Sequence, residues 1–334
     1  MFLAASKLLF FGTVSTLLLK SSFQTQSVVD GHKANFNSPW FMTFVMHVWS
    51  TFFTPTHTKS SDEDSSLLIK PTHSRFWFFI PTLFDLAATA TSSIALSQST
   101  VPSSLYQLLG ASLLIFTTIN ARIFLKRKQN THQWIGVLLL CVSIVLVACS
   151  ATLEEAGQEA EVLTGIVLLI CAQLFWSGQF VVEELLLQQL NSTTEELVGW
   201  EGVFGSGVMI FVFLPVLESM RVESSIMSIR MIINQPLLIA IILVFMIIVL
   251  AYNIYGQRIT QQLSSVHRTV IESLRSLTVW VFGLTLGLLS QQRYGEEWTR
   301  YSWVKGIGFL VMFIGSLVYN GAPGFKLKGL MYND

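Results

Sequence analysis

The sequence predicts an all-α polytopic membrane protein in which ten transmembrane helices form two inverted five-helix repeats. Three observations lead to this fold class: the composition, the spacing of the apolar stretches, and a likeness between the two halves of the chain. Hydrophobic residues make up 52% of the 334 residues, and charged residues make up only 12%. Soluble domains carry about 25% charged residues. Most of this surface must therefore face something other than water, which excludes a soluble globular enzyme.

The charge balance, the cysteines and the motif content exclude further classes. Twenty basic and twenty acidic residues cancel to a net charge of zero, so no basic surplus recruits nucleic acid. The three cysteines lie in apolar runs without a CxxC spacing, which excludes a disulfide-stapled secreted fold and a zinc cluster. The sequence contains no HExxH, GxSxG, GxxxxGK[ST] or GxGxxG motif. We therefore expect no enzyme, no ATP-driven pump, and neither a cofactor nor a bound metal.

Apolar stretches of about 20 residues are long enough to cross a bilayer. The turn signal Val101-Pro102-Ser103-Ser104 divides one long apolar region into two such stretches. The first span is interrupted by Lys7 and is not followed by an Ala-x-Ala site, so we interpret it as a true span and not a cleaved signal peptide. The predicted spans are 2–20, 38–57, 76–97, 102–120, 133–150, 163–183, 198–217, 237–256, 263–288 and 303–321.

The loops predict the orientation of the chain. The loop after the fourth span contains Arg122, Lys126, Arg127 and Lys128. The next loop contains no base but holds Glu154, Glu155, Glu159 and Glu161. Because short basic loops stay cytosolic, both termini are predicted to be cytosolic. The glycosylation sequon Asn191-Ser192-Thr193 is then cytosolic and unused.

An internal repeat relates the two halves of the chain. Ser103-Ser104-Leu105-Tyr106-Gln107 at the fourth span is echoed by Ser264-Ser265-Val266-His267-Arg268 at the ninth. Because each repeat has an odd number of spans, the halves must have opposite orientation, as in many secondary transporters. The predicted divisions are a first repeat at 1–150, an acidic lumenal loop at 151–162, a second repeat at 163–321 and a short cytosolic tail at 322–334.

The ninth predicted span carries three charges, Arg268, Glu272 and Arg275. Their spacing of i, i+4 and i+7 places them on one helical face. A charge near the bilayer centre costs about 2.5–3.5 kcal/mol on insertion scales, so this face must point away from lipid. Arginine favours two-pronged contact with a carboxylate or phosphate. The face is either a structural ion cluster or a contact for substrate or gating.

Four more polar residues are candidate site residues. Asp85 lies midway along the third span, where it needs a partner, a water-filled cavity or a proton, and a proton suits coupled transport. Glu201 opens the seventh span among glycines that permit close helix approach, so its role is either structural or functional. Gln107 and Gln179 are polar residues expected to face a cavity.

Several motifs occur in order along the chain. They include Gln133-Trp134-Ile135-Gly136, Glu201-Gly202-Val203-Phe204-Gly205, Arg268-Thr269-Val270-Ile271-Glu272-Ser273-Leu274-Arg275 and Val318-Tyr319-Asn320-Gly321. With them the chain resembles the drug/metabolite transporter superfamily and, within it, solute carrier family 35, subfamily F, with a more distant likeness to chloroquine-resistance-type transporters. The resemblance implies a ten-helix inverted-repeat fold with cytosolic termini in an endomembrane, either lysosomal, vacuolar or Golgi-like.

We therefore predict an alternating-access transporter of a small organic solute, either nucleotide-sugar-like or another metabolite, driven by protons or by exchange. Arg268 and Arg275 would contact an anionic group or lock a gate through Glu272. Asp85 or Glu201 would take the proton or a cationic group. The expected partners are the solute and the lipid bilayer, with a homodimer left open. The alternative is a non-transporting membrane regulator or scaffold with the same fold.

Overall fold

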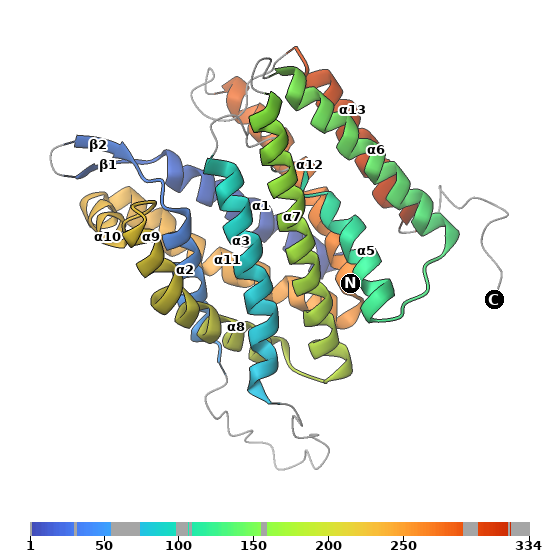
Figure 1. Ribbon diagram of the computed structural model, residues 1–334, viewed down its shortest axis with the longest axis horizontal. Coiled ribbons are helices and arrows are strands. Elements are labelled where there is room, and N and C mark those ends of the chain that lie inside the picture. Colours follow the sequence, from blue (N-terminus) through green and yellow to red (C-terminus); the bar gives the residue numbers. More distant parts are fainter. Residues whose placement is uncertain are drawn as a thin grey trace. The chain divides into compact units, whose positions relative to one another are not determined.

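The structure, a computed structural model, describes residues 2–29, 32–54, 74–97, 106, 109–154, 159–289, 300–319 and 321. In these ranges the chain is almost entirely helical (Figure 1). A two-stranded hairpin, β1 (Gln26–Val29) and β2 (His32–Asn35), is the exception. The helices are α1 (Phe2–Gln24), α2 (Pro39–Thr51), α3 (Phe79–Ser97), α5 (Ser112–Phe124), α6 (Thr131–Glu154), α7 (Glu159–Glu184), α8 (Thr194–Val208), α9 (Leu214–Ser219), α10 (Ser225–Asn234), α11 (Pro236–Gln262), α12 (Ser265–Leu289) and α13 (Ser302–Tyr319).

Seven helical segments among the described residues are long and apolar enough to cross a membrane, and each coincides with a predicted span. These segments are Leu3–Gln24, Arg75–Ala95, Thr131–Ser150, Ala160–Gln189, Thr194–Ser219, Pro236–Gln262 and Ser302–Tyr319. They confirm a polytopic α-helical membrane protein.

The other three predicted spans correspond to α2, α5 and α12. α2 and α5 have 13 residues each, fewer than the ~20 that a straight crossing needs. Residues 102–105, the predicted start of the span that contains α5, lie outside the described residues. α12 has 25 residues, but its three charges make it less apolar than the seven segments. The count of ten spans therefore stays a prediction.

The chain forms two compact units, each built from both halves of the sequence. Unit 1 comprises Met1–Leu83 and Val182–Gln262, and unit 2 comprises Phe84–Val181 and Leu263–Asp334. The predicted boundaries 1–150 and 163–321 describe sequence repeats rather than compact units, so they stay a prediction.

In unit 1, α1 packs against α11, and α2 packs against α8. Glycine allows the second pair to approach closely. A Cβ atom on Gly199 would lie 2.5 Å from the Cα atom of Thr54, and one on Gly202 would lie 2.6 Å from the backbone nitrogen of Thr51. The partner residue number falls as the α8 number rises, so the two helices run antiparallel.

α8 begins and ends for local reasons. The Thr193 side chain accepts from the backbone N–H of Glu196, whose carboxylate accepts from the Thr193 N–H, forming a capping box. Near the other end, Met209–Phe213 forms a π-helical turn before α9. Pro215 follows this turn and has no N–H to donate, which explains why the regular hydrogen-bond ladder is interrupted there.

The hairpin and α10 form a cap on unit 1. Both lie in segments predicted to be loops between spans. The Ser27 hydroxyl donates to the carbonyl oxygen of Met231 at 2.7 Å. The Asn234 amide donates to the carbonyl oxygen of Val28 at 2.8 Å. These bonds join the α1–α2 connection to the α9–α11 connection. We call β1, β2 and α10 the cap (Figure 1).

A carboxylate fixes the start of α2 beside the cap. Glu223 accepts from the backbone N–H of Trp40 at 3.1 Å and from that of Phe41 at 2.7 Å. These N–H groups belong to the first helical turn, which has no intrahelical acceptors. Burial raises the pKa of Glu223 from 4.5 to about 7, although the two N–H bonds act in the opposite direction.

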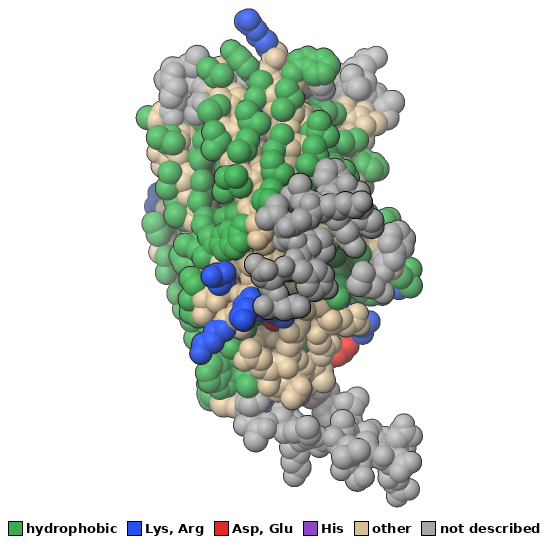
Figure 2. Space-filling model, turned by 90° about the vertical axis from the view of Figure 1, so that its right-hand side faces the viewer, with side chains coloured by type: hydrophobic (Ala, Val, Ile, Leu, Met, Phe, Trp, Pro, Cys, Tyr) green, Lys and Arg blue, Asp and Glu red, His purple; other side chains and the backbone are tan. Residues whose placement is uncertain are grey.

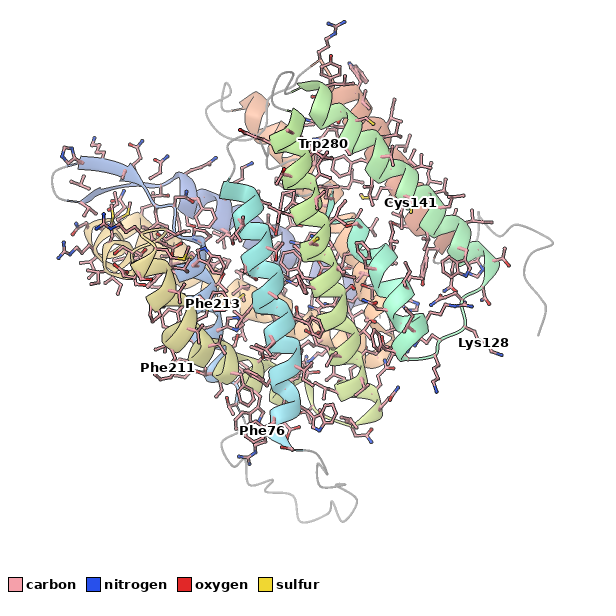
Figure 3. All side chains as sticks on the ribbon, viewed as in Figure 1. Phe76, Lys128, Cys141, Phe211, Phe213 and Trp280 are labelled. Atoms are coloured by element: carbon pink, nitrogen blue, oxygen red, sulfur yellow. The ribbon has the colours of Figure 1, made fainter. Side chains whose placement is uncertain are left out.

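In unit 2, α6 and α13 lie side by side along their length (Figure 1). A Cβ atom on Gly136 would lie 2.8 Å from the carbonyl oxygen of Gly315 and 2.9 Å from the backbone nitrogen of Tyr319. Trp280 on α12 packs on Phe309 of α13, with ring centroids 4.7 Å apart (Figure 3). Small residues and aromatic packing therefore hold α13 against its neighbours.

The outer surface is apolar, as expected of a protein in lipid. Leu138 on α6 is 64% exposed, and Leu310 on α13 is 58% exposed. In unit 1, Phe211 is 81% exposed and lies on the π-helical turn before α9 (Figure 3). Figure 2 shows a face whose upper part is mostly hydrophobic, with Lys and Arg gathered lower.

Replacing Gly199 by alanine should destabilise unit 1, because the new methyl group meets backbone atoms of Phe53 and Thr54, in the turn just after α2, that cannot move aside. We expect a loss of about 1–3 kcal/mol, typical of overpacking, measured as a lower Tm in detergent. Gly207→Ala on the same helix is the control, because a Cβ atom there has no neighbour within 4 Å. Equal Tm changes in the two variants would contradict the close α2–α8 contact.

The stability of the protein should depend on pH through Glu223. Between pH 4.5 and about 7 the folded chain holds a proton on this carboxyl that the unfolded chain has released. Stability therefore falls as pH rises through this window and levels off above it. The Tm difference between wild type and Glu223→Gln, measured from pH 4.5 to 8, should change across the window and stay constant above it. A difference that is constant over the whole range would exclude this role.

Candidate functional site

The three charges on α12 lie in unit 2 and find protein partners there. Arg275 Nε lies 2.7 Å from Glu272 Oε2, and the Glu272 side chain is only 5% exposed against 28% for Arg275. The guanidinium carbon of Arg268 lies 3.8 Å from the ring centroid of Phe180 on α7, and Arg268 is 3% exposed. An ion pair and a cation–π contact thus stabilise the three charges of α12.

Three side chains of α7, within five residues of one another, contact three different helices of unit 2. Trp176 donates its indole N–H to Asp85 of α3 at 3.1 Å. Asn120 of α5 donates its amide N–H to the Ser177 hydroxyl at 2.5 Å. About one turn further along α7, the ring of Phe180 lies against the guanidinium of Arg268 of α12. α7 is therefore the helix through which the polar groups of unit 2 are connected.

Tyr106 belongs to the same neighbourhood. It lies close enough to Arg275 and Asp85 for both charges to act on its hydroxyl. Gln179, on α7, is 8% exposed. The structure thus brings Arg268, Glu272, Arg275 and Asp85 into one polar region of unit 2, which we call the α7–α12 cluster; it comprises these four residues with Tyr106, Trp176, Gln179 and Phe180.

Glu201 lies in unit 1 with different partners. Gln257 of α11 donates its amide N–H to Glu201 Oε2 at 2.9 Å, and Gln257 is 2% exposed. Four residues along α8, Gly205 lies against the ring of buried His47 of α2. On α11 and α1, Tyr255 accepts from Lys7 Nζ at 3.2 Å. Unit 1 therefore contains a polar layer of its own, in which a buried amide orients the Glu201 carboxylate.

The comparison with known proteins settles the family. The family model SLC35F, described as solute carrier family 35, matches residues 4–321. The chain belongs to solute carrier family 35. Family membership indicates a transporter rather than an enzyme, in agreement with the absence of enzyme motifs, and it confirms the resemblance inferred from the motifs. The chain is thus a solute carrier and a multi-pass integral membrane protein.

Named relatives match along most of the solute carrier's length. Human solute carrier family 35 member F6 is 26% identical over 337 residues, covering 95% of this chain and 88% of the relative. An uncharacterized protein of Schizosaccharomyces pombe is 23% identical over 268 residues, covering 77% of this chain and 78% of that protein. A crystal structure matches with a TM-score of 0.57 at 12% identity, covering 95% and 94% of the two chains, and shares the fold.

The structure places six of the seven predicted site residues of this family member. Arg268, Glu272, Arg275, Asp85 and Gln179 lie in unit 2, and Glu201 lies in unit 1, whereas Gln107 lies outside the described residues. Within the described ranges no group of three or more His, Cys, Asp or Glu could hold a metal ion.

The structure adds partners that sequence reasoning missed. Phe180 and Trp176 resemble ordinary apolar residues of a span, so nothing in the sequence marks them as partners of Arg268 and Asp85. Asn120 and Gln257 are uncharged polar residues inside apolar helices. Their polarity was a detectable signal, because such groups need hydrogen-bond partners in a membrane.

Proposed function

We propose that this solute carrier is a secondary, alternating-access transporter of a small organic solute and that the α7–α12 cluster contacts the solute. The observation that carries the proposal is the arrangement on α12. A buried Glu272 is paired with the more exposed Arg275, and Arg268 lies against an aromatic ring in the same cluster. Charges in a span are costly and are commonly found at solute pathways.

The unequal exposure of Arg275 and Glu272 supports a gating role. The Arg275 side chain is 28% exposed whereas that of Glu272 is 5% exposed, so an anionic group of a solute can reach Arg275 without first unburying Glu272. A carboxylate or phosphate on the solute would compete with Glu272 for the same donors. This competition favours a solute with an anionic group, such as a nucleotide-sugar-like or another acidic metabolite.

Asp85 or Glu201 is proposed to take up the coupling proton or a cationic group. Each is a carboxylate in a membrane-spanning segment, where a charge is costly. Asp85 accepts an N–H bond from Trp176 and Glu201 accepts one from Gln257, so a neutral donor orients each carboxylate. Proton coupling would follow from the protonation of one of these carboxylates.

The helix pairs within the units support the inverted five-helix repeat. Numbering the predicted spans in order, α2 with α8 is the pair 2 and 7, α5 with α12 is 4 and 9, and α6 with α13 is 5 and 10. Exchanging each span with the one five later leaves these pairs unchanged. The α1–α11 pair corresponds to spans 1 and 8, and the same exchange converts it into spans 6 and 3, which are α7 and α3. These two helices are joined by the hydrogen bond from Trp176 to Asp85. A two-fold relation between repeats requires this pattern.

The orientation and the organelle are part of the proposal. The exposed residues Arg122, in the last turn of α5, and Lys126 and Lys128, in the loop that leads to α6, form a basic connection; Lys128 is labelled in Figure 3. This connection favours a cytosolic position and hence cytosolic termini. The endomembrane location, lysosomal, vacuolar or Golgi-like, rests on the resemblance to the family. A homodimer is compatible with these features.

Transport by purified protein in sealed vesicles tests the proposal. A screen of anionic and cationic metabolites, with and without a pH gradient, should find a solute that accumulates. Arg275→Ala should then reduce uptake about 10- to 100-fold, since a hydrogen bond to a charged group contributes about 1.5–3 kcal/mol. Asp85→Asn should abolish the dependence on the pH gradient. Arg258→Ala is the control, because Arg258 forms an exposed ion pair with Glu195.

Normal transport by Arg275→Ala and Asp85→Asn would refute the site assignment. Folded protein that binds partners but moves no solute would favour the regulator or scaffold alternative.

A further inference from the structure

α10 has two faces of different character. Ser228 is 1% exposed and Met231 is 3% exposed, and both point into unit 1. On the opposite side, Ile226 is 61% exposed, Ile229 is 46% exposed and Ile233 is 66% exposed. The spacing of 226, 229 and 233 forms a single stripe along the helix. α10 therefore has a buried side and an apolar stripe, and the described part of the chain leaves the stripe exposed.

The chain connections fix α10 at the membrane surface. α10 follows a span that ends at Ser219 and precedes one that begins at Pro236. Only residues 220–224 and Gln235 separate it from these two segments. A ten-residue helix held between two crossings cannot leave the surface where both of them end. Leu237, in the first turn of α11, is 59% exposed, so the exposed apolar surface continues from α10 into the next span.

Hydrogen bonds to α2 and to the hairpin fix the position of α10. Ser228 donates its hydroxyl proton to the Ser38 hydroxyl oxygen at 2.8 Å, at the start of α2. Asn234 and Ser27 join the helix to the hairpin, as described above. These bonds fix the rotation of α10, so the isoleucine stripe is held outward and cannot turn into the protein.

The place of α10 in the chain favours lipid as the partner of the stripe, because α10 lies where two membrane-spanning segments end and its exposed apolar surface continues into the second of them. Arg230 is exposed and lies between Ile229 and Ile233 on the same face. At a lipid surface its long side chain reaches the phosphate layer while its methylene groups stay among apolar neighbours. A basic residue within an apolar stripe is typical of helices that lie in the bilayer interface.

We propose that α10 is an interfacial helix that inserts Ile226, Ile229 and Ile233 among the acyl chains of the lumenal leaflet, with Arg230 at the phosphate groups. Because it ties the α1–α2 connection to the α9–α11 connection, the cap anchors one end of unit 1 to lipid. This inference does not depend on the identity of the solute or on transport.

Site-specific fluorescence tests the lipid contact. Cys141, Cys149 and Cys171 are replaced by alanine in the full chain, and single cysteines are introduced as Ile229→Cys or Ile233→Cys. Each is labelled with a nitrobenzoxadiazole dye and reconstituted in phosphatidylcholine vesicles. Asn35→Cys is the control, since Asn35 is an exposed polar residue of the same cap.

The α10 labels should emit at shorter wavelength than the Asn35 label. They should also lose most of their fluorescence when the lipids carry bromine near the headgroup end of the acyl chains. Emission like that of the Asn35 label would overturn the proposal. A blue-shifted emission that brominated lipid does not quench would overturn it as well, because a protein surface would then cover α10. Agreement between the two labelled positions guards against a local disturbance at either one.

Discussion

The inability of the bilayer to solvate charge is the constraint on which the structure of this solute carrier depends. Arg268, Glu272 and Arg275 occupy one helix, and none of them can face lipid without a large penalty. In unit 2, Glu272 and Arg275 form an ion pair, and the guanidinium of Arg268 lies against the aromatic ring of Phe180. The rotation of α12 is thereby determined: Arg268 on its charged face lies against Phe180 of α7, while Val281, on a different side of the helix, remains about half exposed.

The absence of a hydrophobic driving force between helices in lipid explains the second feature, the use of glycine. Helices in a membrane associate through close packing and hydrogen bonds. Gly202 lets α8 approach the backbone of α2, Gly199 lets it approach the turn that follows α2, and Gly136 lets α6 approach α13. Hydrogen bonds between helices, such as the one from Gln257 to Glu201, add directional contacts to this packing. Close packing brings the helices together, and the hydrogen bonds determine which helix pairs with which.

Sequence reasoning could predict those features that follow from composition and from helical spacing. The apolar stretches identified the seven long segments, and the i, i+4, i+7 spacing identified the charged face of α12. It could not predict that Arg268 rests on Phe180 or that Asp85 accepts from Trp176, because these contacts join residues 88 and 91 positions apart. It also missed α10, whose short length and interposed Ser225, Ser228 and Arg230 make it resemble a loop between spans.

The most direct test of the central claim, that the charged face of α12 borders a water-filled solute path, is thiol labelling of reconstituted protein. Ile271→Cys, between Arg268 and Arg275 on that face, is compared with Val281→Cys, which lies on a different side of α12 and is 49% exposed, both without native cysteines. A charged methanethiosulfonate reagent should modify position 271 much faster than position 281, and a transported solute should slow it. Equal rates, or reaction at 281 alone, would contradict the account.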